Sequence, residues 1–131
     1  MFEDGVVDLG NGVIVGPGLA EADFLAAAEG WSRPAVLNGS YRSYSLPAVD
    51  LNGRCFNPGI YFFEGVVTTV ILTLFDGGRI SPIAEDRDNA LWLATCLGGG
   101  PSTTNDYSFP WGELRTFIDW RADSAMVIMT Y

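Results

Sequence analysis

The carboxylates are the most numerous reactive groups of this sequence, which has sixteen Asp and Glu residues among 131. Two facing carboxylates can hydrolyse a glycosidic bond without a histidine, because one acts as the general acid and the other as base or nucleophile. The candidate acids for such a pair are Glu64, Asp76, Glu85, Asp86, Asp88, Glu113 and Asp119. Most of them fall in predicted turns or before a predicted helix, where solvation and capping account for them. We therefore expect no catalytic pair of acids.

The other groups on which enzymes rely are missing from the sequence. It contains no histidine, and all seven of its basic residues are arginines. The usual general base near neutral pH, the usual Schiff-base amine and the commonest metal ligand are thus absent. We predict that the chain is not an enzyme and that it binds no cofactor.

Two short patterns resemble ion or phosphate sites but lack essential positions. The acids of residues 85–89 alternate as in a calcium loop, yet the glycine and the terminal glutamate of such a loop are missing. The glycines and proline of residues 98–101 follow a predicted helix instead of opening one, so we interpret them as a helix stop. We predict neither a metal site nor a phosphate site.

The two cysteines, Cys55 and Cys96, lie in a strand-like and a helical run respectively. No histidine is present to activate a thiol, and two cysteines alone make a poor zinc site. Intracellular chains seldom keep a disulfide. We expect two buried, reduced thiols.

The net charge of −9 and the isoelectric point near 4.1 limit the class of partner. Such a chain repels nucleic acid and anionic membranes and attracts a basic protein. Arg42 lies between Tyr41 and Tyr44, a pattern that can bind single-stranded nucleic acid, but the charge favours cross-strand packing instead. The apolar run over residues 66–75 is about half of a membrane-spanning helix, and the first residues are acidic, unlike a secretory signal. We expect a cytoplasmic protein that binds neither nucleic acid nor membrane.

The hydrophobic pattern predicts one domain of the α+β class over residues 1–131. The expected order is β-β-α-β-β-β-α-β-β: a hairpin around Asn11-Gly12, a helix over 19–29, strands over 41–51 and 54–63 joined at Asn52-Gly53, a strand over 66–75, a helix over 90–97 led by acids, a loop over 101–107, and strands over 114–120 and 125–131. Short connections favour a mainly antiparallel sheet of about five to seven strands with both helices packed on it. We expect residues 66–75 at its centre with both faces at least partly covered, because both are largely apolar.

The segment from Tyr107 to Glu113 combines large aromatic residues with an acid at a predicted loop-to-strand junction. Tryptophan and tyrosine dominate the binding energy of protein interfaces. Core packing is the simpler explanation of Phe109 and Trp111. We expect Trp111 to be partly buried and mainly stabilising, and its contribution to partner binding stays open.

The acid-led helix with Leu91-Trp92-Leu93, the run Phe109-Pro110-Trp111-Gly112-Glu113, Asp119 and the terminal strand through Val127 and Tyr131 form a familiar arrangement. Over about the last two thirds of the chain, it resembles small bacterial immunity-like proteins of polymorphic or contact-delivered toxin systems. The resemblance implies a protein that binds and blocks a cognate toxin or effector. The candidate partner-binding residues are Asp106, Tyr107, Trp111, Glu113 and Asp119.

Two further function classes stay open. Secretion chaperones are also small, acidic α+β proteins, but they begin with an amphipathic helix, whereas this chain begins with a predicted hairpin. A small-ligand-binding domain or an enzyme would need a cavity lined by aromatic residues and an acid with a perturbed pKa. Neutralisation of a basic toxin by an acidic, aromatic-containing surface is the leading hypothesis, because complementary charge speeds association.

Overall fold

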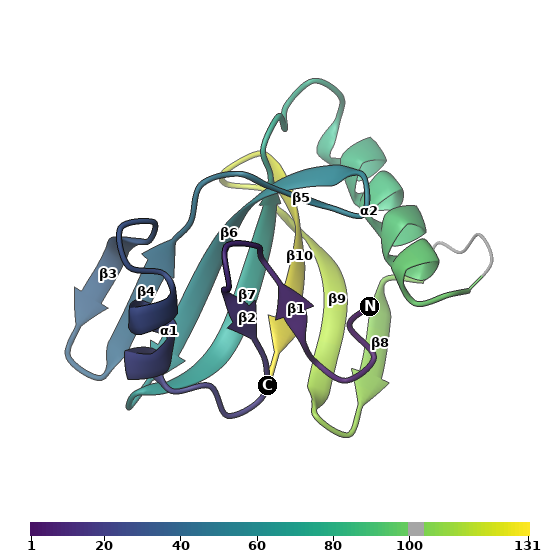
Figure 1. The fold of residues 1–131 in the computed structure, drawn as a ribbon. Helices are drawn as coiled ribbons and strands as arrows, with labels where there is room; N and C mark the ends of the chain where they lie inside the picture. The colour runs from purple at the N-terminus through teal and green to yellow at the C-terminus, as the bar shows by residue number, and fades with distance from the viewer. Residues whose placement is uncertain (100–103) are drawn as a thin grey trace.

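Two helices and ten strands make up the part of the chain that the computed structural model describes, residues 1–99 and 104–131. Their order and bounds are β1 (Val7–Asp8), β2 (Ile14–Val15), α1 (Glu21–Ala27), β3 (Arg33–Asn38), β4 (Tyr41–Ser45), β5 (Val49–Leu51), β6 (Arg54–Phe63), β7 (Val66–Leu74), α2 (Pro82–Cys96), β8 (Asp106–Phe109), β9 (Gly112–Asp119) and β10 (Ser124–Thr130). The α+β class is confirmed (Figure 1).

The main sheet has eight strands, and seven of them follow the order β3-β4-β6-β7-β10-β9-β8, with β5 paired to β6. Every neighbouring pair is antiparallel. Strand β7 is central, as its run of β-branched residues predicts. Strands β1 and β2 form a separate hairpin.

Both predicted Asn-Gly turns are present. Asn52 and Gly53, with φ angles of 51° and 83°, connect β5 to β6. Asn11 and Gly12, with φ angles of 53° and 79°, lie in the connection of β1 and β2. Asparagine and glycine are the residues that tolerate two successive positive φ values, which explains why these positions end strands.

The strand count exceeds the prediction at three places. Strand β3 was not predicted, because all six of its residues are exposed and show no alternation of buried positions. The predicted strand over residues 41–51 is divided into β4 and β5 around Pro47, which cannot donate to a ladder. Part of the predicted loop over residues 101–107 forms the start of β8, while residues 101–103 lie outside the described residues.

The two helices also differ in their bounds. Helix α1 is shorter than predicted, and Phe24 is its buried anchor. Helix α2 begins at Pro82, well before residue 90, because the side chain of Ser81 caps it by accepting a hydrogen bond from the Ala84 N–H. Glu85, expected ahead of the helix, therefore belongs to its first turn.

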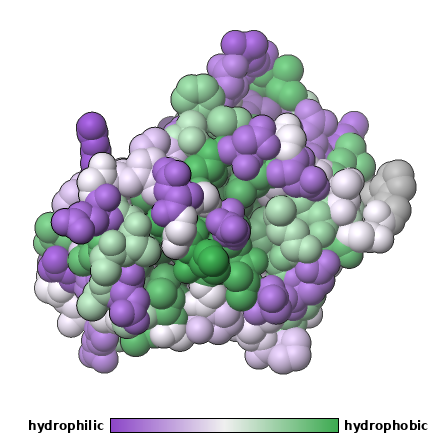
Figure 2. Space-filling model, in the orientation of Figure 1, coloured by the Kyte–Doolittle hydropathy of each residue, from purple (hydrophilic) through white to green (hydrophobic). Residues whose placement is uncertain are grey.

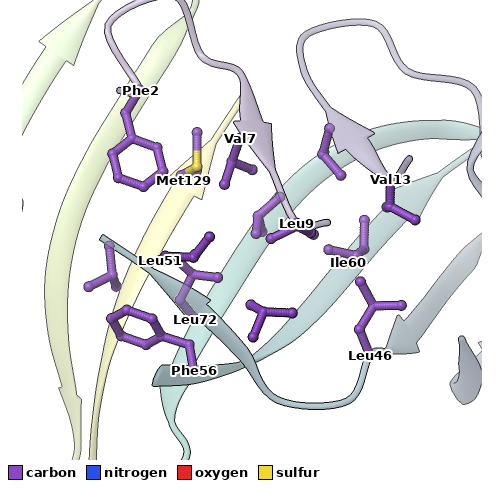
Figure 3. Close-up of a cluster of buried hydrophobic side chains, with 14 of the residues drawn as sticks. Phe2, Val7, Leu9, Val13, Leu46, Leu51, Phe56, Ile60, Leu72 and Met129 are labelled. Carbon is purple, nitrogen blue, oxygen red and sulfur yellow. The ribbon is translucent and has the colours of Figure 1, made fainter. Parts of the chain in front are cut away.

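A single hydrophobic core covers one face of the sheet (Figure 3). Figure 1 shows α1 and the β1–β2 hairpin in front of this face, and Figure 2 shows hydrophilic residues interspersed with hydrophobic ones on that side. The core combines Phe2, Val7 and Leu9 with alternate positions of the sheet and with residues of both helices, among them Phe24, Trp92, Leu93, Phe56, Ile60, Val70, Leu72, Leu114, Val127 and Met129. Both helices thus pack on the sheet, on the same side.

The opposite side of the sheet contributes no residue to this core. The strand registers assign to it Val36, Tyr41, Ser43, Tyr61, Phe63, Thr69, Ile71, Thr73, Asp106, Ser108, Glu113, Arg115, Phe117, Met126, Ile128 and Thr130, and we call this surface the open face. The second face of β7, which we expected to be covered at least in part, is shielded only by its neighbours within the sheet. Thr69, Ile71 and Thr73 are half-buried by their neighbours in the sheet, and no described helix or hairpin packs over them.

Candidate functional site

Trp111 lies in the tight turn that joins β8 to β9. Its ring stacks on Phe109, with centroids 5.2 Å apart, and packs against Tyr131 at 5.6 Å. Its indole N–H donates a 2.9 Å hydrogen bond to the carbonyl oxygen of Glu3. Trp111 is therefore half-buried and connects the two ends of the described chain.

Two glycines make this arrangement possible. A Cβ on Gly5 would lie 2.6 Å from the Trp111 ring, and a Cβ on Gly112 would lie 1.9 Å from the carbonyl oxygen of Thr130. The hydroxyl group of Tyr131 donates a 2.8 Å hydrogen bond to the carbonyl oxygen of Gly5 and so joins the end of β10 to the same group of residues. Burial, and secondarily the charge of Asp4, raises the pKa of Tyr131. We call the group of Glu3, Gly5, Phe109, Trp111 and Tyr131 the latch.

The remaining predicted partner-binding residues are divided among different environments. Tyr107 is half-buried and packs against the core. Asp119 accepts hydrogen bonds from the backbone N–H groups of Arg121 and Ala122, at 3.0 and 3.4 Å, and so shapes the β9–β10 turn. Of the five predicted partner-binding residues, only Asp106 and Glu113 are exposed on the open face.

Large aromatic residues accompany these two acids on the open face. Tyr41 is 63% exposed, Phe117 42%, Tyr61 38% and Phe63 37%. The rings of Tyr41 and Phe63 are cross-strand neighbours with centroids 4.6 Å apart, which agrees with the cross-strand packing predicted around Arg42. Sequence reasoning did not assign these aromatics to a surface, because alternation looks the same whether or not another element covers the face.

A cavity of about 430 Å³ opens between the aromatic residues of β4 and β6 and residues of β3 and β7. We call it the aromatic cavity, and its side-chain lining is Val36, Tyr41, Ser43, Tyr61, Phe63, Thr68 and Thr69. Ser43 is only 3% exposed, and its hydroxyl has no hydrogen-bond partner. Gly59 leaves room for the Tyr61 ring, since a Cβ there would lie 3.3 Å from the ring atom Cε2.

One charged residue, Arg42, also lines the aromatic cavity. Its Nε donates to the Glu21 carboxylate at 2.7 Å, and the Tyr44 hydroxyl donates to the same oxygen. Burial opposes ionisation of Glu21, but the two hydrogen bonds and the Arg42 charge outweigh it and lower its pKa. Burial and the bond to Glu21 raise the pKa of Tyr44. The charge of Arg42 is thus neutralised within the protein.

Several of the acids considered for catalysis have structural partners. Three of them, Asp76, Glu85 and Asp88, also line one cavity. Glu85 is 4% exposed, and its carboxylate accepts the Gly78 N–H at 2.9 Å, which closes the β7–α2 loop. A second cavity of about 310 Å³ lies beside Glu85, Asp88 and Arg54. Within residues 1–99 and 104–131, no three Asp, Glu, Cys or His side chains are arranged to hold a metal ion.

The thiols of Cys55 and Cys96 are both free. Cys96 is buried and Cys55 is half-buried. Burial raises the pKa of the Cys96 thiol despite a hydrogen bond from Asn52. A raised pKa disfavours the thiolate form that a nucleophile requires.

Comparison of the chain with protein-family models, with curated proteins and with solved structures gave no match. Neither helix in the described part of the chain is long and apolar enough to cross a bilayer.

Proposed function

We propose that this chain is a binding protein that neutralises a cognate toxin or effector by docking it on the open face of the sheet. The observation that carries the proposal is the exposure of Tyr41, Tyr61, Phe63 and Phe117 on a sheet face that no other described element covers. Contiguous exposed apolar surface marks interaction sites, and aromatic side chains supply much of the binding energy at such sites.

Charge supports a basic partner. The chain carries a net charge of −9, and Asp106 and Glu113 are exposed at the β8–β9 end of the open face. Opposite charge on the partner would speed association and orient it before the aromatic residues make contact. The resemblance of the last two thirds of the sequence to immunity-like proteins supports the same class. We propose that the chain binds this partner in the cytoplasm.

The aromatic cavity favours a second candidate function, the binding of a small ligand. Its volume of about 430 Å³ lies within the usual range of ligand sites, and its lining combines aromatic rings with hydroxyl groups. Under this alternative the cavity alone would be functional, and the strands β8 and β9 would take no part in binding.

Growth protection tests the proposed function directly. The genes adjacent to that of this chain would be sequenced, each toxin domain that they encode would be co-expressed with the chain, and cell growth would be followed. We expect the wild-type chain to restore growth. Failure of the wild-type chain to protect against the neighbouring toxin would contradict the proposal.

A matched pair of variants then locates the surface. Phe117→Ser removes an exposed aromatic ring from the open face outside the aromatic cavity, whereas Ile14→Ser removes an exposed side chain of the β1–β2 hairpin on the covered side. We expect loss of protection for Phe117→Ser and full protection for Ile14→Ser. Unaltered protection by Phe117→Ser would favour a function confined to the aromatic cavity.

A further inference from the structure

We propose that the aromatic cavity receives an arginine side chain of the partner. This inference rests on the proposed function, because it names the chemical group by which the open face would hold a basic protein. The shape of the cavity, its unsatisfied hydroxyl group and the charge around it each favour an arginine side chain.

The first step is the shape of the cavity. A Cβ atom added to Gly59 would lie 3.3 Å from Cε2 of Tyr61. The tyrosine ring therefore lies over the backbone of its own strand at Gly59. One face of this ring is therefore directed outward, and 38% of the residue is exposed. The contacting rings of Tyr41 and Phe63 form a wall beside it. A planar guanidinium group stacks on such aromatic faces and gains cation–π attraction from them.

The second step is the hydroxyl of Ser43, which lines the cavity without a hydrogen-bond partner. A hydroxyl oxygen can accept hydrogen bonds, and a buried polar group that lacks a partner is destabilising. Thr68, also in the lining, already donates its hydroxyl to the Tyr61 carbonyl oxygen at 3.3 Å. A guanidinium has five N–H donors, so it can bond to Ser43 while it stacks on the rings. An aliphatic side chain would leave Ser43 unsatisfied.

The third step is charge. The only charged residue in the lining, Arg42, is paired with Glu21 at 2.7 Å, which reduces its repulsion of a second cation. Glu64 follows Phe63, and its backbone N–H donates to the Ser40 carbonyl oxygen at 3.0 Å, which places this exposed acid beside Tyr41. An exposed acid in the adjacent β6–β7 turn and a net charge of −9 favour a cationic ligand over a neutral or anionic one.

Titration with small probes tests the inference without the partner protein. The amide resonances of the full chain would be followed by NMR during addition of N-acetyl-arginine amide, at roughly 1 to 50 mM because a single side chain binds weakly. N-acetyl-citrulline amide, which is neutral and nearly isosteric, and N-acetyl-lysine amide serve as matched probes. We expect saturable shifts around Ser43, Tyr61 and Thr69 with the arginine probe and at least tenfold weaker binding of the other two.

Three results of this titration would overturn the inference. They are equal binding of the citrulline probe, equal binding of the lysine probe, and shifts that spread over the surface acids without saturating in the cavity. The first would indicate shape recognition alone, the second a general cation site, and the third unspecific attraction to a negative protein.

Variants of the chain give a second, independent readout. Tyr61→Leu keeps an apolar side chain but removes the aromatic face, so it should abolish saturable binding of the arginine probe. Phe117→Leu makes a comparable change on the same face outside the cavity and should leave this binding unchanged. Equal binding by both variants would contradict the inference, and their melting temperatures verify that both are folded.

The probe experiment separates this inference from the proposed function. Arginine binding in the cavity without protection against the neighbouring toxin would refute the proposed function and leave the cavity assignment standing. Protection without arginine binding in the cavity would refute the cavity assignment alone.

Discussion

At Trp111 three segments that are far apart in the sequence meet: the first residues, the β8–β9 turn and the end of β10. The ring contacts Phe109 and Tyr131, and its N–H bonds to Glu3. Most contacts of Trp111 are thus internal to the chain. The aromatic-Pro-Trp-Gly run that suggested a partner surface has a structural explanation here, and partner contact through the remaining exposed part of Trp111 stays a prediction.

The latch predicts that Trp111→Ala destabilises the protein. Loss of two ring contacts and one hydrogen bond at a half-buried site should lower the free energy of unfolding by about 2 to 3 kcal/mol. Trp120→Ala is the control, since Trp120 is 63% exposed and its loss should change stability by less than about 0.5 kcal/mol. Urea denaturation measures both, and equal stability of the two variants would contradict the role of the latch.

The pair of Arg42 and Tyr44 around Glu21 predicts sensitivity to acid. The pKa of Glu21 is lowered in the folded state, so its contribution to stability is complete above the unfolded pKa and is lost as the pH falls through the folded pKa. The free energy of unfolding should decline below about pH 5, and less steeply in Glu21→Gln. Denaturation at a series of pH values checks this, and parallel acid profiles for the two proteins would exclude Glu21 as a cause.

At the scale of the elements, contact between neighbouring strands explains why the residue after Trp111 is glycine. A side chain on Gly112 would collide with the backbone carbonyl of Thr130, and the φ angle of 150° is itself one that other residues rarely adopt. The start of β9 can approach the end of β10 this closely only with glycine at this position.

Gly112→Ala should therefore be far more damaging than an ordinary glycine replacement. We expect a loss of about 2 to 4 kcal/mol, because backbone must move in both strands. Gly99→Ala is the matched control, since a Cβ there meets only the Ala94 carbonyl oxygen at an ordinary 3.5 Å. Thermal unfolding distinguishes them, and a Gly112→Ala melting temperature as high as that of Gly99→Ala would disprove the close approach.

The elements that sequence patterns predict well are those set by local chemistry. The turn at Asn52-Gly53 and the β-branched run of β7 are examples, because a positive φ preference and a strand preference act within a few residues. Strand β3 escaped prediction since its exposed residues leave no alternating signal. The start of α2 was misplaced because the local signal of Ser81 as the cap and Pro82 as the first helical residue was not recognised.

The candidate site was less predictable than the fold. Asp106 and Glu113 were predicted to bind the partner and are exposed, but the aromatic residues Tyr41, Tyr61 and Phe63 of the same open face come from strands distant in the sequence. Whether a sheet face is open depends on where every other element packs. In β7 a bulge opposite Tyr61 and Phe62 also places Val67 in the core, 3% exposed, and Val66 outside it, 45% exposed. A one-residue shift of this kind reverses the face of each side chain that follows.

At the scale of the whole molecule, the absence of histidine predicts a nearly flat stability between about pH 6 and pH 8. The shifted carboxyl, tyrosine and thiol groups all have pKa values displaced away from neutrality. Tyr44 and Tyr131 have raised pKa values in the folded state. Their contribution to the free energy of unfolding is therefore complete below about pH 10 and is lost as the pH rises through the folded pKa values. Chemical denaturation from pH 6 to 11 checks both parts, and a steep change near pH 7 would contradict them.

The acidity of the whole chain also predicts how binding responds to salt. If a basic partner is attracted by the net charge of −9, its association rate and affinity should fall as salt rises from roughly 0.05 to 0.5 M. Stopped-flow mixing of the purified pair measures the rate. A rate independent of salt would remove the electrostatic part of the proposal, while the aromatic part could be tested separately.

The most direct test of the open face as the docking surface is the calorimetric affinity of the chain for the toxin domain against which it protects cells in the growth experiment. Tyr61→Ser and Ile14→Ser would be compared with the wild-type chain, because both positions are exposed but lie on opposite sides of the sheet. We predict affinity at least about 30-fold weaker for Tyr61→Ser, as for an aromatic hot spot, and within about twofold of wild type for Ile14→Ser. Undiminished affinity of Tyr61→Ser, or a loss confined to Ile14→Ser, would contradict the account.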